Sequence, residues 1–323
     1  MRKEDLRIVF MGTPEFAVET LKALVENNYN VVAVVTQPDK PVGRHQTEMQ
    51  PSQVKQYAVA HGLPVLQPEK MKDPEFVEQL RSYNANLQVV VAFRMLPEVV
   101  WAMPEYGTFN VHAALLPQYR GAAPINWAVI NGETQTGVTT FFLDHDIDTG
   151  RIILKKTFDI PDEADVEYVY DGLMHLGAEI CLETLEAIVA ANGHPDSIPQ
   201  DSVLDGSAIK PAPKIFKETC EIDWKKTAKQ VYDFVRGLSP YPGAWTTLVA
   251  PDGKETVLKI YKTHKTGKPG KGIGTITIEG KALCVSAADE QLEIVELQLA
   301  GKKRMMARDF LNGMKQIEDY RVK

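Results

Sequence analysis

The sequence predicts an α/β protein of two domains: a Rossmann-like, mostly parallel sheet with helices on both faces, followed by a smaller C-terminal OB-like β-barrel. Three observations support this fold class. The chain has 323 residues, which is more than one hydrophobic core usually spans. A strand, a helix and a second strand alternate within residues 6–36. After residue 214 the pattern changes to short β-prone runs separated by Gly, Pro and Asp.

The first elements predict a βαβ unit. Residues 6–11 are apolar and end at Gly12-Thr13-Pro14, residues 15–26 have helical periodicity, and residues 31–36 form the next strand. Such a unit gives parallel strands joined by a right-handed crossover. The turn has one glycine and lacks the G-x-G-x-x-G pattern that lets a backbone approach a pyrophosphate, so a dinucleotide cofactor is disfavoured.

The rest of the first domain alternates in the same way. Residues 37–50 contain prolines, a glycine and charges without an apolar period, so we expect a long exposed loop. The other expected helices are residues 52–61, 74–83, 125–131 and 166–191. The other expected strands are residues 87–92, 108–112, 137–143 and 150–158, the last at the edge of the sheet.

The domain boundary is expected where prolines and small polar residues gather. Residues 193–213 contain four prolines and are the predicted linker, which leaves residues 1–192 and 214–323 as the two domains. The second domain is expected to have a short helix and five strands that form a small barrel. The helix is residues 227–237, and the strands are residues 246–250, 256–263, 274–279, 282–286 and 292–299.

Composition and charge limit the class of protein. With 44% hydrophobic and 24% charged residues, no long apolar run and no leader pattern, the chain is expected to be cytoplasmic and without a membrane segment. Cys181, Cys220 and Cys284 lack metal or disulfide spacing and are expected to be buried. Residues 1–208 carry 15 Lys and Arg against 29 Asp and Glu, whereas residues 209–323 carry 21 against 14. The basic C-terminal part is therefore either a phosphate-binding surface or an ordinary solvated face.

The strongest candidates for chemistry are Asn110, His112 and Asp148. Asn110 and His112 stand two apart at the end of a predicted strand, so their side chains share a face. An amide that donates to an oxyanion, an imidazole that moves a proton and a carboxylate from a second element are the groups that an acyl transfer needs. Because no Ser or Cys accompanies them, the acyl group is expected to pass directly to a nucleophile of the substrate, such as an amine.

The acidic loop Asp144-His145-Asp146-Ile147-Asp148 also suggests a metal site. The twelve-residue calcium pattern with its closing Glu is absent, and spacing by two within a loop is weak evidence for ligands. We therefore expect no metal.

Several motifs together resemble the folate-dependent formyltransferases. They are Asn110-Val-His112, Leu115-Leu116-Pro117, Arg120-Gly-Ala-Ala-Pro-Ile125 and Asp148-Thr-Gly150. The opening Ile8-Val-Phe-Met-Gly12-Thr-Pro-Glu-Phe16, the segment Thr36–Arg44 and the tail Ala300-Gly-Lys-Lys303 narrow the resemblance to the branch that acts on methionyl-tRNA. The likeness covers nearly the whole chain, in order. It implies a one-carbon group transferase of translation initiation, with 10-formyltetrahydrofolate as formyl donor and the α-amino group of methionyl-initiator tRNA as acceptor.

The resemblance also implies roles for individual residues. Asn110 is expected to bind the oxyanion and position the formyl group, while His112 and Asp148 share the proton transfers, in an order that the sequence leaves open. The expected folate and entrance residues are Phe93, Arg94, Met95, Leu96, Leu115, Leu116, Pro117, Arg120 and Asp144. For Arg120 a surface ion pair is an equal alternative. The expected tRNA-binding residues are Arg44, Lys302, Lys303 and Arg304.

Two other functions compete with this one. Another folate-dependent formyltransferase, acting on a nucleotide-linked amino sugar or a glycinamide ribonucleotide, would share the three catalytic candidates. The three candidates therefore cannot exclude it, whereas the basic C-terminal domain speaks against it, because a small substrate gives no reason for such a domain. A nucleic-acid-binding protein without activity is the non-enzymatic alternative, and the intact motif disfavours it. We expect a monomer.

Overall fold

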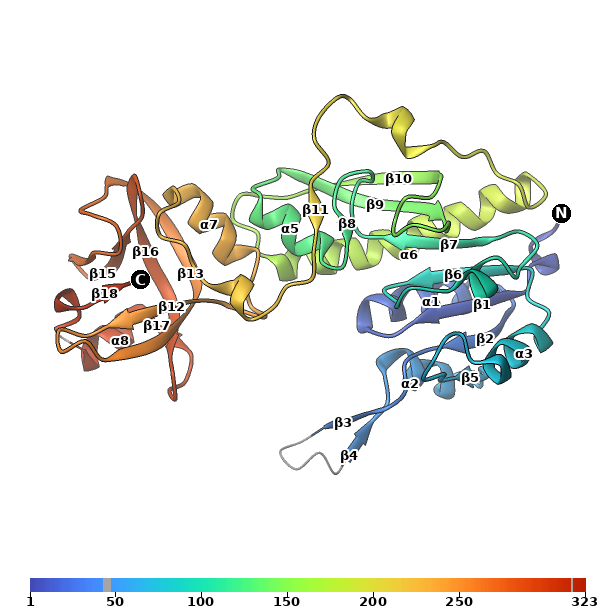
Figure 1. Cartoon of the computed structure of the whole chain (residues 1–323), viewed down its shortest axis with the longest axis horizontal. Coiled ribbons are helices and arrows are strands. Elements are labelled where there is room, and N and C mark those ends of the chain that lie inside the picture. The colour runs from blue at the N-terminus through green and yellow to red at the C-terminus, as the bar shows by residue number, and fades with distance from the viewer. Residues whose placement is uncertain (43–47, 315) are drawn as a thin grey trace. The chain divides into compact units, whose positions relative to one another are not determined.

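The computed structural model describes residues 1–42, 48–314 and 316–323, which form two compact units (Figure 1). The first unit comprises residues 1–121, 136–159 and 170–211, and the second comprises residues 122–135, 160–169 and 212–323. The segment expected as a linker therefore groups with the first unit as far as Pro211. The functional boundaries at residues 192 and 214 stay a prediction.

A seven-stranded sheet runs through the first unit in the order β10-β9-β7-β6-β1-β2-β5 (Figure 1). The neighbouring strand pairs β5–β2, β2–β1, β1–β6 and β6–β7 are parallel, and β9 runs antiparallel to β7. The predicted mostly parallel sheet is confirmed, with β10 at its edge. The bounds are β1 Ile8–Gly12, β2 Val31–Val35, β5 Val65–Leu66, β6 Leu87–Val91, β7 Thr108–His112, β9 Gln135–Phe142 and β10 Ile152–Asp159.

Helices pack on both faces of this sheet because the strands are apolar on both sides. On one face, Val9, Ala33 and Val90 share a core with α3 (Pro74–Ser82) and α4 (Glu98–Trp101). On the other face, Thr140 of β9 exchanges a 2.8 Å hydrogen bond with Thr184 of α6 (Val166–Ala190). Helix α1 (Glu15–Glu26) adjoins α6 through the rings of Phe16 and Tyr170, and α2 (Gln53–Ala60) packs on α1.

The turn after β1 has a packing role. A Cβ atom on Gly12 would lie 2.6 Å from the Cβ of Ala17 and 2.9 Å from the carbonyl oxygen of Val91. Glycine is therefore required there for the close approach of α1 and β6 to β1.

Residues 37–50, expected to be a long exposed loop, contain two short strands that the sequence did not predict. Strands β3 (Lys40–Val42) and β4 (Glu48–Gln50) pair antiparallel, with Lys40 opposite Gln50. Sequence pattern missed them because a strand whose two faces are both solvated has no apolar alternation to detect. Arg44 lies between them, outside the described residues.

The second unit contains the predicted barrel. Its main sheet has the order β14-β15-β16-β13-β12-β18, and a bridge between Thr275, next to β14, and Arg321 of β18 joins the two ends of that sheet. The barrel interior is filled by Leu258, Ile260, Leu292 and other apolar side chains, which pack together with α7. The strands are β12 Ala244–Val249, β13 Glu255–Pro269, β14 Ile276–Glu279, β15 Ala282–Ser286, β16 Glu290–Leu299, β17 Met305–Met306 and β18 Arg321–Val322; the helices are α5 Pro124–Ile130, α7 Ala228–Arg236 and α8 Ala307–Gly313.

The remaining elements are short. Strands β8 (Arg120–Gly121) and β11 (Pro211–Ala212) form a separate two-stranded sheet. The 3-10 helices are η1 Lys3–Asp5, η2 Gln200–Val203, η3 Glu218–Cys220 and η4 Ile317–Asp319.

Candidate active site

Strand β7 presents Asn110 and His112 on the sheet face opposite α6. In register, Val111 of β7 stands beside Thr140 of β9, and Thr140 bonds to α6. Because successive side chains of a strand point to opposite faces, Asn110 and His112 point away from α6. Asn110 stands beside Val90 of β6, and the side chain of Val90 belongs to the core that α3 and α4 cover. The predicted common face of Asn110 and His112 is thus present.

The imidazole of His112 is held by a main-chain group on one side and faces a carboxylate on the other. Its Nε2 lies 2.8 Å from the carbonyl oxygen of Tyr119, and its Nδ1 lies 3.9 Å from Oδ2 of Asp148. Only 6% of the side chain is exposed. Because a carbonyl oxygen can only accept, Nε2 must carry the hydrogen of this bond. In the neutral ring Nδ1 is therefore unprotonated, with its lone pair towards Asp148.

Asp148 is fixed in an unusual backbone conformation. Its φ of 57° lies in the left-handed region, which aspartate tolerates better than most residues. Its Oδ2 accepts a 2.9 Å hydrogen bond from the backbone N–H of Gly121, and 13% of its side chain is exposed. The structure therefore brings His112 and Asp148 together, as the sequence predicted for the imidazole and the carboxylate.

Asn110 has an unused hydrogen-bonding atom. Its side-chain Oδ1 is buried and has no hydrogen-bond partner among the described residues. A buried acceptor without a partner is costly, and its cost is removed when a ligand supplies a donor. The amide can therefore accept from an N–H of a bound molecule through Oδ1 while its Nδ2 donates.

A glutamine that sequence analysis missed links two of the predicted site residues. Oε1 of Gln200 accepts hydrogen bonds from Nε and Nη2 of Arg120, at 3.0 and 2.8 Å. Its Nε2 donates to the carbonyl oxygens of Asp148 and Gly150, at 2.8 and 2.9 Å. Nothing in the sequence distinguishes Gln200 from the other polar residues of the expected linker.

The predicted entrance residues take different positions. Leu116 is fully buried against Phe141 and Ile152, and Pro117 is also buried, whereas Leu115 is half-buried. The backbone N–H of Leu116 donates to Oγ1 of Thr139, which fixes the loop to β9. Leu116 therefore shapes the loop from within the core.

The predicted folate segment is also divided between core and surface. Leu96 lies in the core, Phe93 packs against that core, and Met95 is 69% exposed. Arg94 donates to the carbonyl oxygens of Glu69 and Pro68, and burial lowers the pKa of its guanidinium. Of these four side chains, only that of Met95 is thus largely exposed.

Asp144 has a local partner in the acidic loop. Its Oδ1 accepts hydrogen bonds from the N–H of Asp146 at 3.2 Å and from Oγ1 of Thr149 at 2.7 Å. These bonds hold the turn that ends at Asp148. Among the residues that the structure describes, no three His, Cys, Asp or Glu side chains gather as metal ligands.

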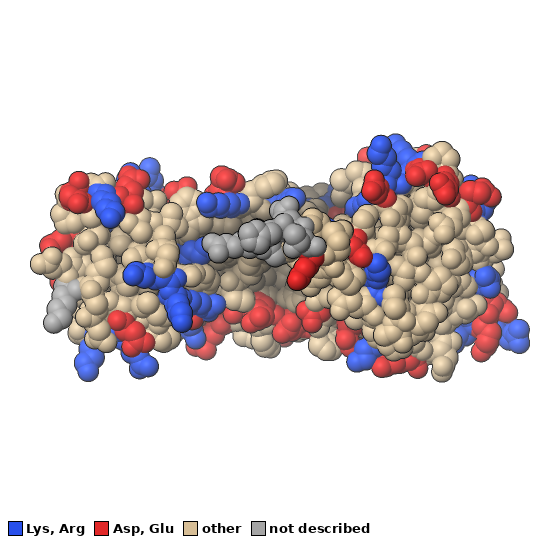
Figure 2. Space-filling model, turned by 90° about the horizontal axis from the view of Figure 1, so that it is seen from below, with Lys and Arg blue, Asp and Glu red and all other residues tan. Residues whose placement is uncertain are grey.

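The basic residues of the second unit differ in how much of their charge is available. Lys302 and Lys303 are exposed. Arg304 instead forms a two-pronged ion pair with Glu296, at 2.6 and 2.8 Å, and its guanidinium lies 4.1 Å from the centre of the Tyr261 ring. The hydrogen bond to Glu296 raises the pKa of Arg304. On the face shown in Figure 2, Lys and Arg atoms of this unit adjoin one another between acidic residues.

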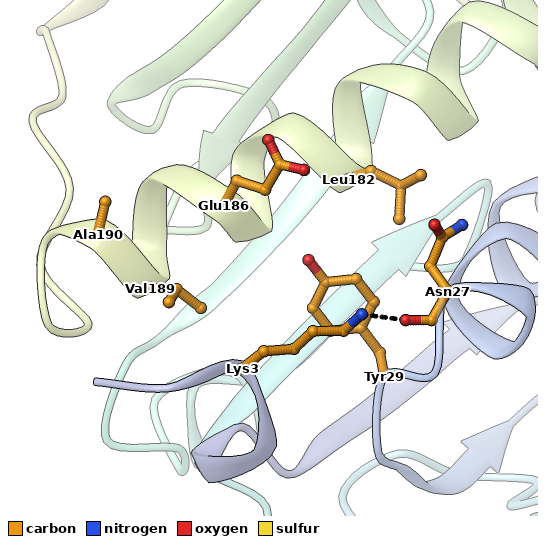
Figure 3. Close-up of a pocket in the computed structure, with 7 residues that line it drawn as sticks. All are labelled: Lys3, Asn27, Tyr29, Leu182, Glu186, Val189 and Ala190. Carbon is orange, nitrogen blue, oxygen red and sulfur yellow. Dashed lines mark hydrogen bonds between the residues drawn. The ribbon is translucent and has the colours of Figure 1, made fainter.

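One pocket of the first unit lies apart from these residues (Figure 3). It is lined by Tyr29 and Lys3 together with side chains of α6 such as Glu186, and Nζ of Lys3 donates to the carbonyl oxygen of Asn27. None of the catalytic candidates lines it. Within the described ranges, no helix has the length and apolar character needed to cross a membrane.

The chain matches two family models, one after the other along the sequence. Residues 6–185 match the formyl transferase model, and residues 214–315 match the model for the formyl transferase C-terminal domain. Solved structures with the same fold include a sugar 3N-formyl transferase with a TM-score of 0.62 at 17% identity, covering 92% of this chain and 99% of that one. HypX from Aquifex aeolicus, solved with tetrahydrofolic acid, aligns over 96% of this chain and 48% of its own, with a TM-score of 0.61 at 19% identity.

Much more similar relatives are known by sequence. A methionyl-tRNA formyltransferase of Parabacteroides distasonis is 60% identical over the full length of both chains. One of Porphyromonas gingivalis is 48% identical over 97% of each. The resemblance drawn from the motifs is confirmed: the chain belongs to the methionyl-tRNA formyltransferase family of formyl transferases.

Proposed function

We propose that this protein transfers a formyl group from 10-formyltetrahydrofolate to the α-amino group of methionyl-initiator tRNA. The relatives that are 48–60% identical are named methionyl-tRNA formyltransferases, which supports formyl transfer to methionyl-tRNA. The observation that carries the proposal is the pair formed by Nδ1 of His112 and Oδ2 of Asp148, on the sheet face that also presents Asn110. All three cysteines are buried, which fits direct transfer without a thiolate intermediate.

The unused Oδ1 of Asn110 supports an amine or folate substrate at this place. Both the attacking amine and a reduced pterin carry N–H groups that such an acceptor binds. The same amide then directs Nδ2 towards the formyl oxygen. A hydrogen bond from Nδ2 grows stronger as that oxygen becomes an anion, so it stabilises the transition state more than the bound substrate.

Proton transfer is assigned to His112 and Asp148. The distance of 3.9 Å between Nδ1 of His112 and Oδ2 of Asp148 is too long for a direct hydrogen bond. When the imidazole is neutral, both of these atoms are hydrogen-bond acceptors. A substrate N–H placed between them would therefore find two acceptors. As the amine attacks, a new C–N bond forms and its proton passes to this pair. Collapse of the tetrahedral intermediate breaks the bond to N10 of the folate, and N10 receives a proton from the same pair.

The acceptor is proposed from the second unit. Residues 209–323 carry an excess of seven positive charges, and Lys302 and Lys303 are exposed within them. An acceptor with many phosphates gains from such a surface, whereas a nucleotide-linked amino sugar does not require it. Arg44 is proposed as a further contact with the tRNA. We also propose that the protein is cytoplasmic and a monomer.

A direct assay tests the function. The purified protein is incubated with 10-formyltetrahydrofolate and either methionyl-initiator tRNA, the uncharged tRNA or a nucleotide-linked amino sugar, and formylated product is measured. We expect product with the charged tRNA alone. Product with the amino sugar and none with the tRNA would replace this acceptor by the small-molecule one. No product with either, from protein shown to be folded, would overturn the activity itself.

A further inference from the structure

Gln200 of the predicted linker forms four hydrogen bonds, two with Arg120 and two with main-chain carbonyl oxygens at the end of the acidic loop, at Asp148 and Gly150. Its side-chain amide is fully used: Oε1 accepts twice from Arg120, and Nε2 donates to the carbonyls of Asp148 and Gly150. Only 3% of the residue is exposed. Buried hydrogen bonds that are all satisfied hold their groups in one arrangement, since leaving any of them unmade carries a desolvation cost.

The arrangement bears on Asp148 in particular. The backbone of Asp148 is left-handed. Its carbonyl oxygen accepts a hydrogen bond from Gln200, and its carboxylate accepts one from the N–H of Gly121 and faces the imidazole of His112. A non-glycine residue persists in that conformation where its surroundings hold it there. The two sides of Asp148 are thus held by different parts of the chain, the backbone by Gln200 and the side chain by Gly121.

We propose that Gln200 is a positioning residue for formyl transfer, which sets the distance between Asp148 and His112 by holding the carbonyl oxygens of Asp148 and Gly150. This inference rests on the proposed function for its kinetic part. Gln200 touches neither reacting group, so its effect must pass through Asp148. Arg120 completes the arrangement by fixing the other end of the Gln200 amide.

Two substitutions separate the halves of this side chain. Gln200→Met keeps the length and removes all four bonds. Gln200→Glu keeps an acceptor for Arg120 but replaces the donor by an oxygen that repels the carbonyls of Asp148 and Gly150. If the backbone of Asp148 is what matters, both variants lose kcat by about 10–100-fold with less than about threefold change in either KM, since misplacement of a reacting group by about 1 Å has that effect.

The matched control is Gln118→Ala. Gln118 lies in the loop that follows Pro117 and also contacts the predicted linker. Its Oε1 accepts a 2.8 Å hydrogen bond from the N–H of Lys210, and it has no hydrogen bond to Asp148. We expect its kcat within about twofold of the parent protein, since the hydrogen bonds of this half-buried side chain reach, among the described residues, only Ser207, Ala208 and Lys210 of the predicted linker.

Two further readouts distinguish positioning from a general loss of structure. The double variant Gln200→Met, Asp148→Asn should have a kcat less than about threefold below that of Asp148→Asn alone. The reason is that the effects of two residues are not additive when one acts through the other. Hydrogen exchange of the Gly121 N–H should accelerate at least about tenfold in Gln200→Met relative to Gln118→Ala, with or without substrate.

These readouts also separate this inference from the proposed function. Faster exchange at Gly121 in a protein that formylates no tRNA would refute the function and leave the positioning intact. Normal kcat in Gln200→Glu, or unchanged exchange at Gly121 in Gln200→Met, would overturn the positioning role whatever the acceptor is.

Discussion

Asn110→Ala is expected to separate catalysis from stability. The substitution removes Nδ2, the proposed donor to the formyl oxyanion. One such donor typically contributes about 3–4 kcal/mol to the transition state, so kcat should fall by about 100–1000-fold. Where Oδ1 binds the amine and not the pterin, the KM for the folate should change by less than about threefold, because the bond lost with Nδ2 strengthens only as charge develops on the formyl oxygen.

The free energy of unfolding should change little in the same variant. In the parent protein Oδ1 of Asn110 is buried without a partner in the described residues, so no hydrogen bond of the folded chain is lost with it. Removing an unsatisfied buried acceptor relieves a desolvation cost of about 1–3 kcal/mol. The loss of packing of one small side chain opposes this, and we expect a net change within about 1 kcal/mol.

The assay compares initial rates of formyl transfer with thermal unfolding of the same preparation. Thr139→Val is the control for a disturbed loop, because Oγ1 of Thr139 holds Leu116 and the carbonyl oxygen of Ala114. That variant should lose stability. An Asn110→Ala protein with turnover within tenfold of the parent would refute the assignment of Nδ2. A fall of several kcal/mol in its stability would show that the amide has a structural partner.

Three further outcomes are expected. A protein with both His112→Ala and Asp148→Ala should be no more than about tenfold slower than the worse single variant, because the two groups act on one proton; multiplied losses in the rate assay would show that they act separately. Lys302→Ala with Lys303→Ala should lower the slope of log affinity for tRNA against log salt by about one per residue, and an unchanged slope would leave these lysines as solvation only. Burial raises the pKa of the Cys181 thiol, so alkylation at pH 8 should spare it until the protein unfolds, and mass-spectrometric labelling of native protein would contradict this.

The elements that the sequence predicted well have one apolar side in a regular period. The helix expected at residues 166–191 is found as Val166–Ala190, and the strand expected at residues 108–112 is found as Thr108–His112. Both bury a hydrophobic stripe or face, which is the property that periodicity reports. The shared face of Asn110 and His112 follows from the same alternation.

Elements whose position depends on partners far along the chain were not predictable in this way. Strand β13 continues to Pro269, beyond the expected end at residue 263, because its exposed last residues still pair with β16 at Glu290. Helix α8 was missed as well, since it buries only Ala307 and Phe310. The pairing of Arg304 with Glu296 also lay beyond prediction, because a list of charges does not show which are neutralised by a neighbour.

The candidate site likewise combines residues that the sequence predicted with groups whose position depends on the folded chain. Residue type, spacing and the family resemblance together predicted Asn110, His112 and Asp148 as the catalytic candidates, because the chemistry of these residues resides in their side chains. The groups that orient them are a carbonyl at Tyr119, an N–H at Gly121 and the amide of Gln200. The first two are main-chain atoms, which every non-proline residue possesses, and their position is set by backbone conformation alone. At Tyr119 that conformation is left-handed, with φ of 62°, and it directs the carbonyl to the imidazole while the N–H donates to Lys210. Orientation of the imidazole thus depends on the path of the loop more than on which side chain the loop carries there.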